Sequence, residues 1–544
     1  MAEFTRRQFV KMSGVVLASA SLGGVLSACG SEPAGPNHGT DEVIVAMSPG
    51  SEPAAGFNPC VAWGCGEHVH EPLIQSTLIT TNTDLEFVND LATSYECSPD
   101  GMTWTFAIRD DVKFTDGEPL TASDVAFTIN TINASDAAQA DLSMVKKAVA
   151  VSDTVVELQM AKPNNALLYT LAVLGIVPEH AYDENYGTNP IGSGRYMLQQ
   201  WDQGQQAIFV ANPDYYGDAP AMQRVTVLFM SEDAALSAAQ SGDVDIAYTS
   251  ATMCQNVPAG YELLNCKSVD SRGISLPVLP AGSKPRVGMD GVEHDVGNDV
   301  TCDLALRQAM NCGVDREAMI ANVLNGYGTV AYSVGDGMPW SSPDMKVDYD
   351  PESAVKILAD DGWVAGDDGV LQKDGVRASF TLMYAAGDSV RQALATEFAN
   401  QMAALGIEVQ VAGGDWDTDL YPHEFDTPIL WGWGSNAPVE LYELTYSSGW
   451  GNVACYDNDT VDGYLDAALA APKIEDSYEL YQKAQWDEET LTGVAPQGAS
   501  TWIWLANIDH LYFSREGLQV AEQKPHPHGH GWSLVNNVDK WSWA

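Results

Sequence analysis

Residues 100–129, DGMTWTFAIRDDVKFTDGEPLTASDVAFTI, decide the fold. In the first half of this segment Trp104, Phe106 and Ile108 alternate with small or polar residues. This period of two predicts a strand with one buried face. Asp116-Gly117 then predicts a tight turn, because glycine accepts backbone conformations that other residues avoid. The segment therefore begins with a strand and a turn.

A helix is expected directly after this turn. Thr121, followed three positions later by Asp124, has the pattern of a capping box, in which each residue bonds the backbone of the other. The pattern predicts a helix that begins after Thr121 and runs through Ile129. The second half of the segment is therefore helical.

Units of a helix followed by a strand recur later in the chain. Ser231 and Gly242 are the expected bounds of one helix, which precedes a strand over 244–248. Another helix ends at Gly406, before a strand over 407–411, and its apolar stripe consists of Val390, Leu394, Phe398, Met402 and Leu405. The repeated units predict a mixed α/β protein.

The N-terminus has the order of an export signal. Arg6-Arg7 lies in a charged segment, an apolar run follows from Met12 to Ala28, and Cys29 comes directly after it. The run is shorter than the roughly 20 residues that a membrane-spanning helix needs. The segment resembles a twin-arginine signal joined to a bacterial lipobox, which implies that Cys29 is lipidated. We expect the protein to be anchored by this lipid to the outer face of the cytoplasmic membrane, at the cell surface or in the periplasm.

The chain is strongly acidic, with 74 Asp and Glu residues against 26 Lys and Arg and a formal net charge of −48. This balance argues against nucleic acid as a partner, because no basic cluster is present to displace counterions from phosphates. A solvated acidic surface is the simpler interpretation. At roughly 150 residues per domain, the length suggests about three domains.

The cysteines allow disulfides but indicate no known cysteine motif. Nine cysteines are present, and an exported protein can oxidise those that follow Cys29. Cys60 with Cys65, and Cys254 with Cys266, are near enough in sequence to close small loops. The chain has no Cys-x-x-Cys pattern, so neither a zinc ribbon nor a thioredoxin-type site is indicated.

Five segments together resemble the extracytoplasmic solute-binding proteins of ABC importers, in the large family that serves oligopeptides, dipeptides and nickel complexes (bacterial solute-binding protein family 5). In family order, the segments are 100–129, 192–217 (GSGRYMLQQWDQGQQAIFVANPDYYG), 306–328 (LRQAMNCGVDREAMIANVLNGYG), 338–339 with 350–363 (MP and DPESAVKILADDGW), and 431–456. They extend over nearly the whole mature chain.

This resemblance implies an α/β fold of the two-lobed periplasmic-binding-protein type (class II), with an additional inserted α/β domain and a ligand cleft between the lobes. By analogy, the expected parts are the signal at 1–28, a tether at 29–40, lobe I at 41–75, 192–275 and 500–544, the inserted domain at 76–191, and lobe II at 276–499.

The resemblance also implies a function in binding and not in catalysis. We expect a monomeric receptor that captures a short peptide or similar small solute and delivers it to a membrane permease. No Gly-x-Ser-x-Gly, His-Glu-x-x-His or phosphate-binding glycine-rich motif is present, in agreement with a protein that is not an enzyme. No cofactor is expected, although a metal such as nickel can be part of the ligand.

The richest candidate for a ligand site is the segment that begins at Trp431. Trp431 and Trp433 point to one face of an extended segment, and tryptophan offers a flat apolar wall with one N–H donor. In peptide-binding relatives an aspartate in this region commonly neutralises the amino group of the ligand. The matching position here is Asn436, with Glu440 nearby. Core tryptophans followed by a turn are the alternative interpretation.

A second candidate lies near the first strand, where members of the family build part of the cleft. It contains Phe57, Trp63, His68 and His70. The two histidines fall on one face of an extended segment and are suitable metal ligands. A surface loop closed by Cys60 and Cys65 is the alternative.

The C-terminal segment 525–532, PHPHGHGW, contains the metal-ligand candidates His526, His528 and His530. Proline and glycine between the histidines give a simple turn as the alternative. These residues, with His68 and His70, support a rival hypothesis, a receptor for nickel or a metal chelate. A more distant rival is a twin-arginine-exported enzyme with a cofactor.

Overall fold

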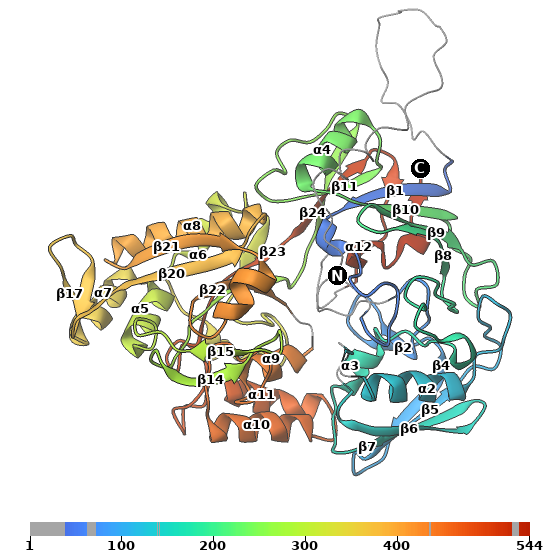
Figure 1. Ribbon diagram of the computed structural model, residues 1–544, viewed down its shortest axis with the longest axis horizontal. Helices are drawn as coiled ribbons and strands as arrows, with labels where there is room; N and C mark the ends of the chain where they lie inside the picture. The colour runs from blue at the N-terminus through green and yellow to red at the C-terminus, as the bar shows by residue number, and fades with distance from the viewer. Residues whose placement is uncertain are drawn as a thin grey trace, which may run out of the picture. The chain divides into compact units, whose positions relative to one another are not determined.

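The computed structural model describes residues 39–62, 72–135, 137–138, 140, 142–434, 437–524 and 532–544 (Figure 1). The predicted signal, the lipidation site Cys29 and the tether as far as residue 38 lie outside these ranges. Within them, no helix has both the length and the hydropathy needed to cross a bilayer.

The first lobe is built on a seven-stranded sheet with the order β12-β24-β11-β1-β10-β9-β8. The central strand β1 runs parallel to β10 and β11, and the outer pairs are antiparallel. The elements are β1 Glu42–Met47, β8 Tyr196–Asp202, β9 Gln206–Ala211, β10 Arg224–Phe229, α4 Glu232–Ser241, β11 Ile246–Thr249, β12 Tyr261–Cys266, β24 His510–Arg515, β25 Leu518–Gln519, α12 Trp532–Val535 and β26 Ser542–Trp543.

The inserted domain has a four-stranded sheet with the order β4-β5-β7-β6, all antiparallel, and α2 packs against β6 and β7. A separate hairpin, β2–β3, precedes it in the chain. The elements are β2 Ile79–Thr81, β3 Phe87–Asn89, β4 Ala92–Cys97, β5 Thr103–Ile108, α2 Ala122–Asn133, β6 Val145–Ser152, β7 Val155–Met160 and α3 Leu167–Leu171.

The second lobe has a six-stranded sheet with the order β16-β23-β13-β22-β20-β21. Its strands are β13 Ser271–Ser275, β16 Gly328–Val330, β20 Ser379–Ala385, β21 Glu408–Gly414, β22 Ile429–Trp433 and β23 Trp502–Ile508. Its helices are α5 Leu304–Gly313, α6 Arg316–Asn322, α7 Pro351–Asp360, α8 Ser389–Ala404, α9 Val439–Thr445, α10 Asp459–Leu469 and α11 Tyr478–Gln485. Two small sheets are formed by β14 Ser283–Val287 with β15 Glu293–Val296, and by β17 Val364–Ala365, β18 Leu371–Lys373 and β19 Val376–Arg377.

The elements predicted for segment 100–129 are confirmed. Gly117 has φ of +94° in the turn after β5. Thr121 and Asp124 form the capping box at the start of α2, which continues four residues beyond Ile129. The apolar stripe of α8 is also buried as predicted, and Gly406 follows that helix with φ of +80°.

The chain crosses between the two lobes at two neighbouring places. β12 leads to β13 through residues 267–270, and β23 leads to β24 through Asp509. β13 and β23 pair with strands of the second lobe. The predicted boundaries at 275 and 500 placed both strands in the first lobe, whereas their hydrogen bonds place the crossings at 267–270 and 509. A sequence boundary drawn by analogy does not show with which sheet a crossing strand pairs.

Hydrogen bonds join the two crossovers to each other. The amide of Asn265 and the ammonium of Lys267 donate to Asp509 Oδ2, at 3.0 and 2.6 Å. The hydroxyl of Ser268 donates to the carbonyl oxygen of Ile508 at 2.7 Å. The crossovers therefore form one bonded hinge.

The cysteines of the described residues carry free thiols: Cys60, Cys97, Cys254, Cys266, Cys302, Cys312 and Cys455. The suggested bond between Cys254 and Cys266 does not form, because Cys266 pairs with His510 on β24 and Cys254 is buried in the loop after β11. Cys65 lies outside the described residues.

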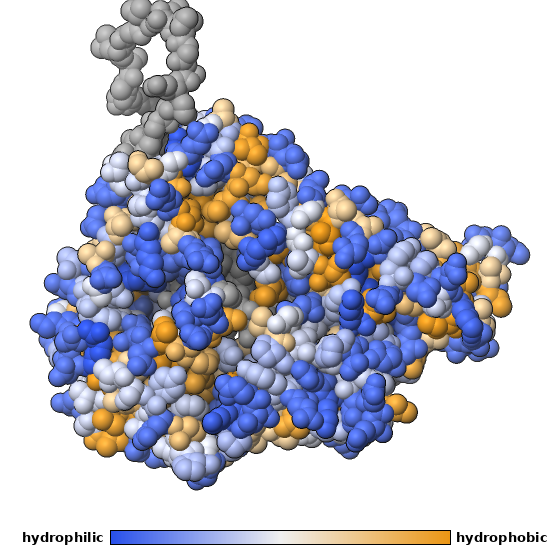
Figure 2. All heavy atoms as spheres, turned by 180° about the vertical axis from the view of Figure 1, so that it is seen from behind, coloured by the Kyte–Doolittle hydropathy of each residue, from blue (hydrophilic) through white to orange (hydrophobic). Residues whose placement is uncertain are grey.

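The face drawn in Figure 2 is largely hydrophilic, with apolar residues in patches between hydrophilic ones.

Candidate functional site

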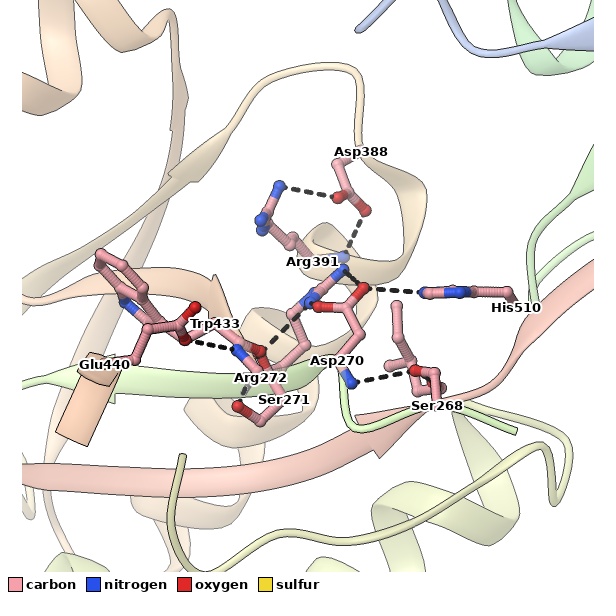
Figure 3. A network of polar contacts seen from close by, with 11 residues as sticks. Ser268, Asp270, Ser271, Arg272, Asp388, Arg391, Trp433, Glu440 and His510 are labelled. Carbon is pink, nitrogen blue, oxygen red and sulfur yellow. Dashed lines mark hydrogen bonds and ion pairs between the residues drawn. The ribbon is translucent and has the colours of Figure 1, made fainter. Parts of the chain in front are cut away.

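A buried cluster of charged side chains lies where β22 ends, beside the crossovers (Figure 3). Arg272 donates to both carboxylate oxygens of Asp270, from Nη1 to Oδ1 and from Nη2 to Oδ2 at 3.1 Å. His510 Nε2 lies 3.0 Å from the same Oδ2. Asp388 Oδ2 accepts from Arg391 Nη1 at 3.0 Å. Arg272 and Asp270 are at most 3 % exposed. The cluster joins one crossover, β13, the start of α8 and β24.

A glycine makes room for this cluster. Gly432 lies opposite Arg272 in the β13–β22 register. A Cβ at position 432 would collide with Arg391 Nη2 and lie only 2.7 Å from Arg272 Nη1. The sequence Trp-Gly-Trp therefore leaves a space on β22 in which two guanidinium groups lie side by side.

The charges in the cluster hold one another in the ionised state. Burial disfavours the charged form of Asp388, but Arg391 and Arg272 outweigh this effect, and its pKa lies below the usual value. Burial and the neighbouring Arg272 lower the pKa of Arg391. Pairing each buried guanidinium with a carboxylate is what a low-dielectric interior requires.

Glu440 lies close to this cluster, in α9. Its carboxylate Oε2 accepts from the backbone N–H of Gly434 at 3.3 Å. Burial raises the pKa of Glu440 well above the usual value, and the negative charge of Asp270 adds to the rise. A carboxyl group in this state gains from a cation that approaches it.

Gly434 brings the end of β22 against the first crossover. A Cβ at this position would lie 2.8 Å from Asp270 Cα, so only glycine permits this approach. The carboxyl of Glu440 therefore lies in the second lobe but directly beside the hinge.

Trp431 and Trp433 share one face of β22, as predicted, and each is 4 % exposed. Four indole rings form a chain of contacts. The ring centroids are 5.2 Å apart for Trp416 and Trp431, 6.0 Å for Trp431 and Trp433, and 5.7 Å for Trp433 and Trp450. Trp450 is 47 % exposed. The indoles thus run from the core of the second lobe to its surface, and Trp431 and Trp433 are part of that core.

Phe57 lies in the core of the first lobe. Its side chain is fully buried, and its ring packs against Trp201 and Phe209, with centroids at 5.2 and 5.6 Å. Phe57, predicted as a ligand residue, therefore serves the packing of the first lobe in this structure. Several predicted site residues lie outside the described residues: Trp63, His68, His70, Asn436, His526, His528 and His530. Within the described ranges, no group of three His, Cys, Asp or Glu side chains is placed to hold a metal.

Comparison with known proteins identifies the family. A family model described as "Bacterial extracellular solute-binding proteins, family 5 Middle" matches residues 86–453, more than half of the chain. The chain belongs to this family. Family 5 members are extracellular binding proteins, and this chain is an ABC-importer solute-binding protein by family.

Two relatives of the family 5 chain are informative. Protein XP55 of Streptomyces lividans is 35% identical over 80% of this chain and 79% of its own length. The oligopeptide-binding protein AppA of Bacillus subtilis is 29% identical over 77% of this chain and 80% of its own length.

Among solved structures, NikZ of Campylobacter jejuni in complex with Ni(L-His) superimposes with a TM-score of 0.78 at 24% identity, over 93% of this chain and 100% of that one. Similarity at this identity establishes the two-lobed fold with its inserted domain.

The sequence did not reveal the charged cluster of this family 5 chain. Asp388 is the N-cap of α8, and Arg272 lies in a short strand whose residues are all buried. Asp270 and His510 are far apart in sequence, and the hinge alone brings them together. The one local signal was Gly432 between two tryptophans, which marks a close approach.

Proposed function

We propose that this chain captures a short peptide or a similar small solute between its lobes and delivers it unaltered to an ABC permease. Family membership supports the binding role, and the name of the B. subtilis relative supports peptide as the class of solute. The observation that carries the proposal is the desolvated carboxyl of Glu440 on α9, which accepts from Gly434, the residue after β22, beside the hinge.

Glu440 is the proposed partner of the ligand's ammonium group. In this chain Asn436 stands where peptide-binding relatives commonly have an aspartate, and Glu440 supplies a carboxyl group four residues later in the sequence. An ammonium that approaches Glu440 favours its ionised form. Binding then releases a proton at any pH below the raised pKa of Glu440.

The tryptophans and the charged cluster are proposed to shape the rest of the site. Trp433 and Trp431 form its apolar wall, and Arg391 with Arg272 hold the end of β22 in place from the opposite side. The proposed site also includes Trp63, His68 and His70, which lie outside the described residues.

Closure of the lobes is proposed as a population shift. A solute that contacts both lobes stabilises the closed form by its differential affinity for that form. The permease then recognises the closed form. The protein acts as a monomer, anchored through lipid on Cys29 at the outer face of the membrane.

Calorimetry of metal-stripped mature protein with the tripeptide trialanine tests this function. We expect binding without metal, with proton uptake by the buffer, and at least a tenfold loss of affinity in Glu440→Gln, because a charged hydrogen-bond partner is removed. Glu479→Gln is the control, since that carboxylate is 79 % exposed on α11.

Binding that requires nickel would replace this function by the rival, a receptor for nickel or a metal chelate. A stoichiometric cofactor retained by the purified protein would favour the exported enzyme. Failure of trialanine and of peptides with other side chains to bind would overturn the peptide hypothesis.

A further inference from the structure

We infer that Asn165 is a latch between the inserted domain and the second lobe, and that it increases solute affinity without touching the solute. The latch consists of hydrogen bonds that Asn165 makes to the end of α10. The inference rests on the proposed function insofar as closure retains a solute. The contact itself is a property of the protein alone.

Asn165 reaches the end of α10 from the loop between β7 and α3. Its backbone N–H donates to the carbonyl oxygen of Leu469 at 3.1 Å. Its side-chain Nδ2 donates to the carbonyl oxygens of Ala468 at 2.8 Å and Ala471 at 3.2 Å, with a longer contact of 3.5 Å to that of Lys473. Asn165 is 9 % exposed. A single residue therefore binds several carbonyl groups within residues 468–473 of the second lobe.

The position explains why the contact is favourable. The last carbonyl groups of a helix have no partner within the helix and need donors from elsewhere. Asn165 donates to the carbonyls of Leu469 and Ala471, whereas that of Ala468 also accepts from the Ala471 amide. The residue type fits as well, because an amide offers N–H donors without a negative charge at the negative end of the helix dipole.

A second contact lies one turn along the same segment. Tyr169 of α3 packs edge-on against Phe87 of its own domain, with ring centroids 4.8 Å apart. Burial raises the pKa of its hydroxyl to about 12, and Tyr478 and Glu475 of the second lobe add to the rise. The segment that bears Asn165 is therefore fixed to its own domain on one side and faces the second lobe on the other.

This contact can open. It involves neither crossover, so the two lobes stay covalently connected when it breaks. In the open form water replaces Asn165 at the end of α10, and the net gain of each hydrogen bond on closure is modest. Such a contact shifts the equilibrium between the open and closed forms towards the closed form but still allows opening.

The latch should affect the affinity for every solute by the same factor. The latch stabilises the closed form equally whichever solute is inside, because Asn165 contacts backbone atoms of the protein. Loss of the latch lowers the population of the closed form and thus the apparent affinity for every solute by the same factor. Dissociation becomes faster, while association, which begins from the open form, keeps its rate.

The first test compares Asn165→Ala with Asn164→Ala in the mature full-length protein. Asn164 is the matched control, since its side chain accepts from the Ala166 amide within its own segment. We expect trialanine to dissociate about tenfold faster from Asn165→Ala, with the same factor for a second tripeptide of different side chains. An unchanged dissociation rate, or different factors for the two tripeptides, would overturn the latch.

Asn165→Asp sharpens this test. A carboxylate removes the donor and places a negative charge against the end of α10, so this variant should lose more affinity than Asn165→Ala. An Asp variant that binds as well as the Ala variant would contradict the capping geometry.

A ligand-free measurement separates the latch from the proposed function. In hydrogen exchange without solute, residues 466–473 should exchange severalfold faster in Asn165→Ala than in wild type, with β5 and β7 unchanged. Equal exchange rates of residues 466–473 in the variant and wild type, or faster exchange of the variant throughout β5 and β7, would contradict the latch. If the wild-type protein binds no peptide, but residues 466–473 still exchange faster in Asn165→Ala than in wild type, the proposed function is wrong and the latch is supported.

Discussion

Among the contacts between parts of the chain, the hinge and the rim at the end of α10 are built differently. At the hinge, Asp270 and His510 belong to the ends of the two crossovers and are bonded to each other within a cluster of buried charges. At the rim, Asn165 bonds the end of α10 through uncharged groups. The hinge contacts accompany chain connections, so we expect them to persist when the lobes open, whereas we expect the rim contacts to break.

This difference separates two roles. Removing one partner of a buried charge pair destabilises the fold strongly, so such pairs suit a hinge whose structure stays constant. Uncharged hydrogen bonds have a small net free energy and suit a part that must open and close. We therefore expect hinge variants to lose folding stability, and rim variants to lose solute affinity with the fold intact.

Asp270→Ala should give the largest effect. It leaves Arg272 buried without its carboxylate, and breaking a buried pair in this way costs about 3–5 kcal/mol in the free energy of unfolding. Urea unfolding measures the loss. Asp111→Ala is the control, because Asp111 pairs with Arg109 at the surface and its side chain is 60% exposed. Equal stability of the two variants would remove the distinction between hinge and surface charges.

Gly432→Ala should give an intermediate loss. Its Cβ would collide with Arg391 Nη2, and overpacking of this kind costs about 1–3 kcal/mol in the free energy of unfolding. Gly463→Ala is the opposite control, since Gly463 lies within α10 with no atom within 4 Å of the added Cβ. Alanine there should stabilise the protein by up to about 1 kcal/mol. A stable Gly432→Ala variant would show that the guanidinium groups do not need this space.

The raised pKa of Glu440 should make the free energy of unfolding depend on pH over one interval. Its pKa is raised in the folded state from a usual value of 4.5, so the folded protein keeps a proton that the unfolded chain releases. Stability should therefore fall as the pH rises from about 4.5 through the raised pKa, and then level off. Urea unfolding of wild type and Glu440→Gln across this interval measures the difference. Parallel pH profiles would show that Glu440 is not the group responsible.

Local patterns predicted much of the fold. The alternation in β5, the capping box at Thr121 and the stripe of α8 depend on neighbours within a few residues, and all three are confirmed. The crossing points were predicted less well. The pairing of β13 and β23 with the second lobe depends on partners that are far away in sequence.

The candidate site was predictable only in part. Trp431, Trp433 and Glu440 were found because they share one short segment. The placement of Asp388 and Arg391 beside Arg272, and of Asp270 beside His510, arises from tertiary packing, and no local spacing shows it. Asn165 was missed for the same reason, since its partners are more than 300 residues away in sequence.

Native mass spectrometry of the mature protein with added trialanine tests the central claim most directly. The account predicts one bound peptide per chain in metal-free buffer, released with its original mass when the protein is unfolded. A peptide of altered mass, or no adduct for any short peptide tried, would contradict it.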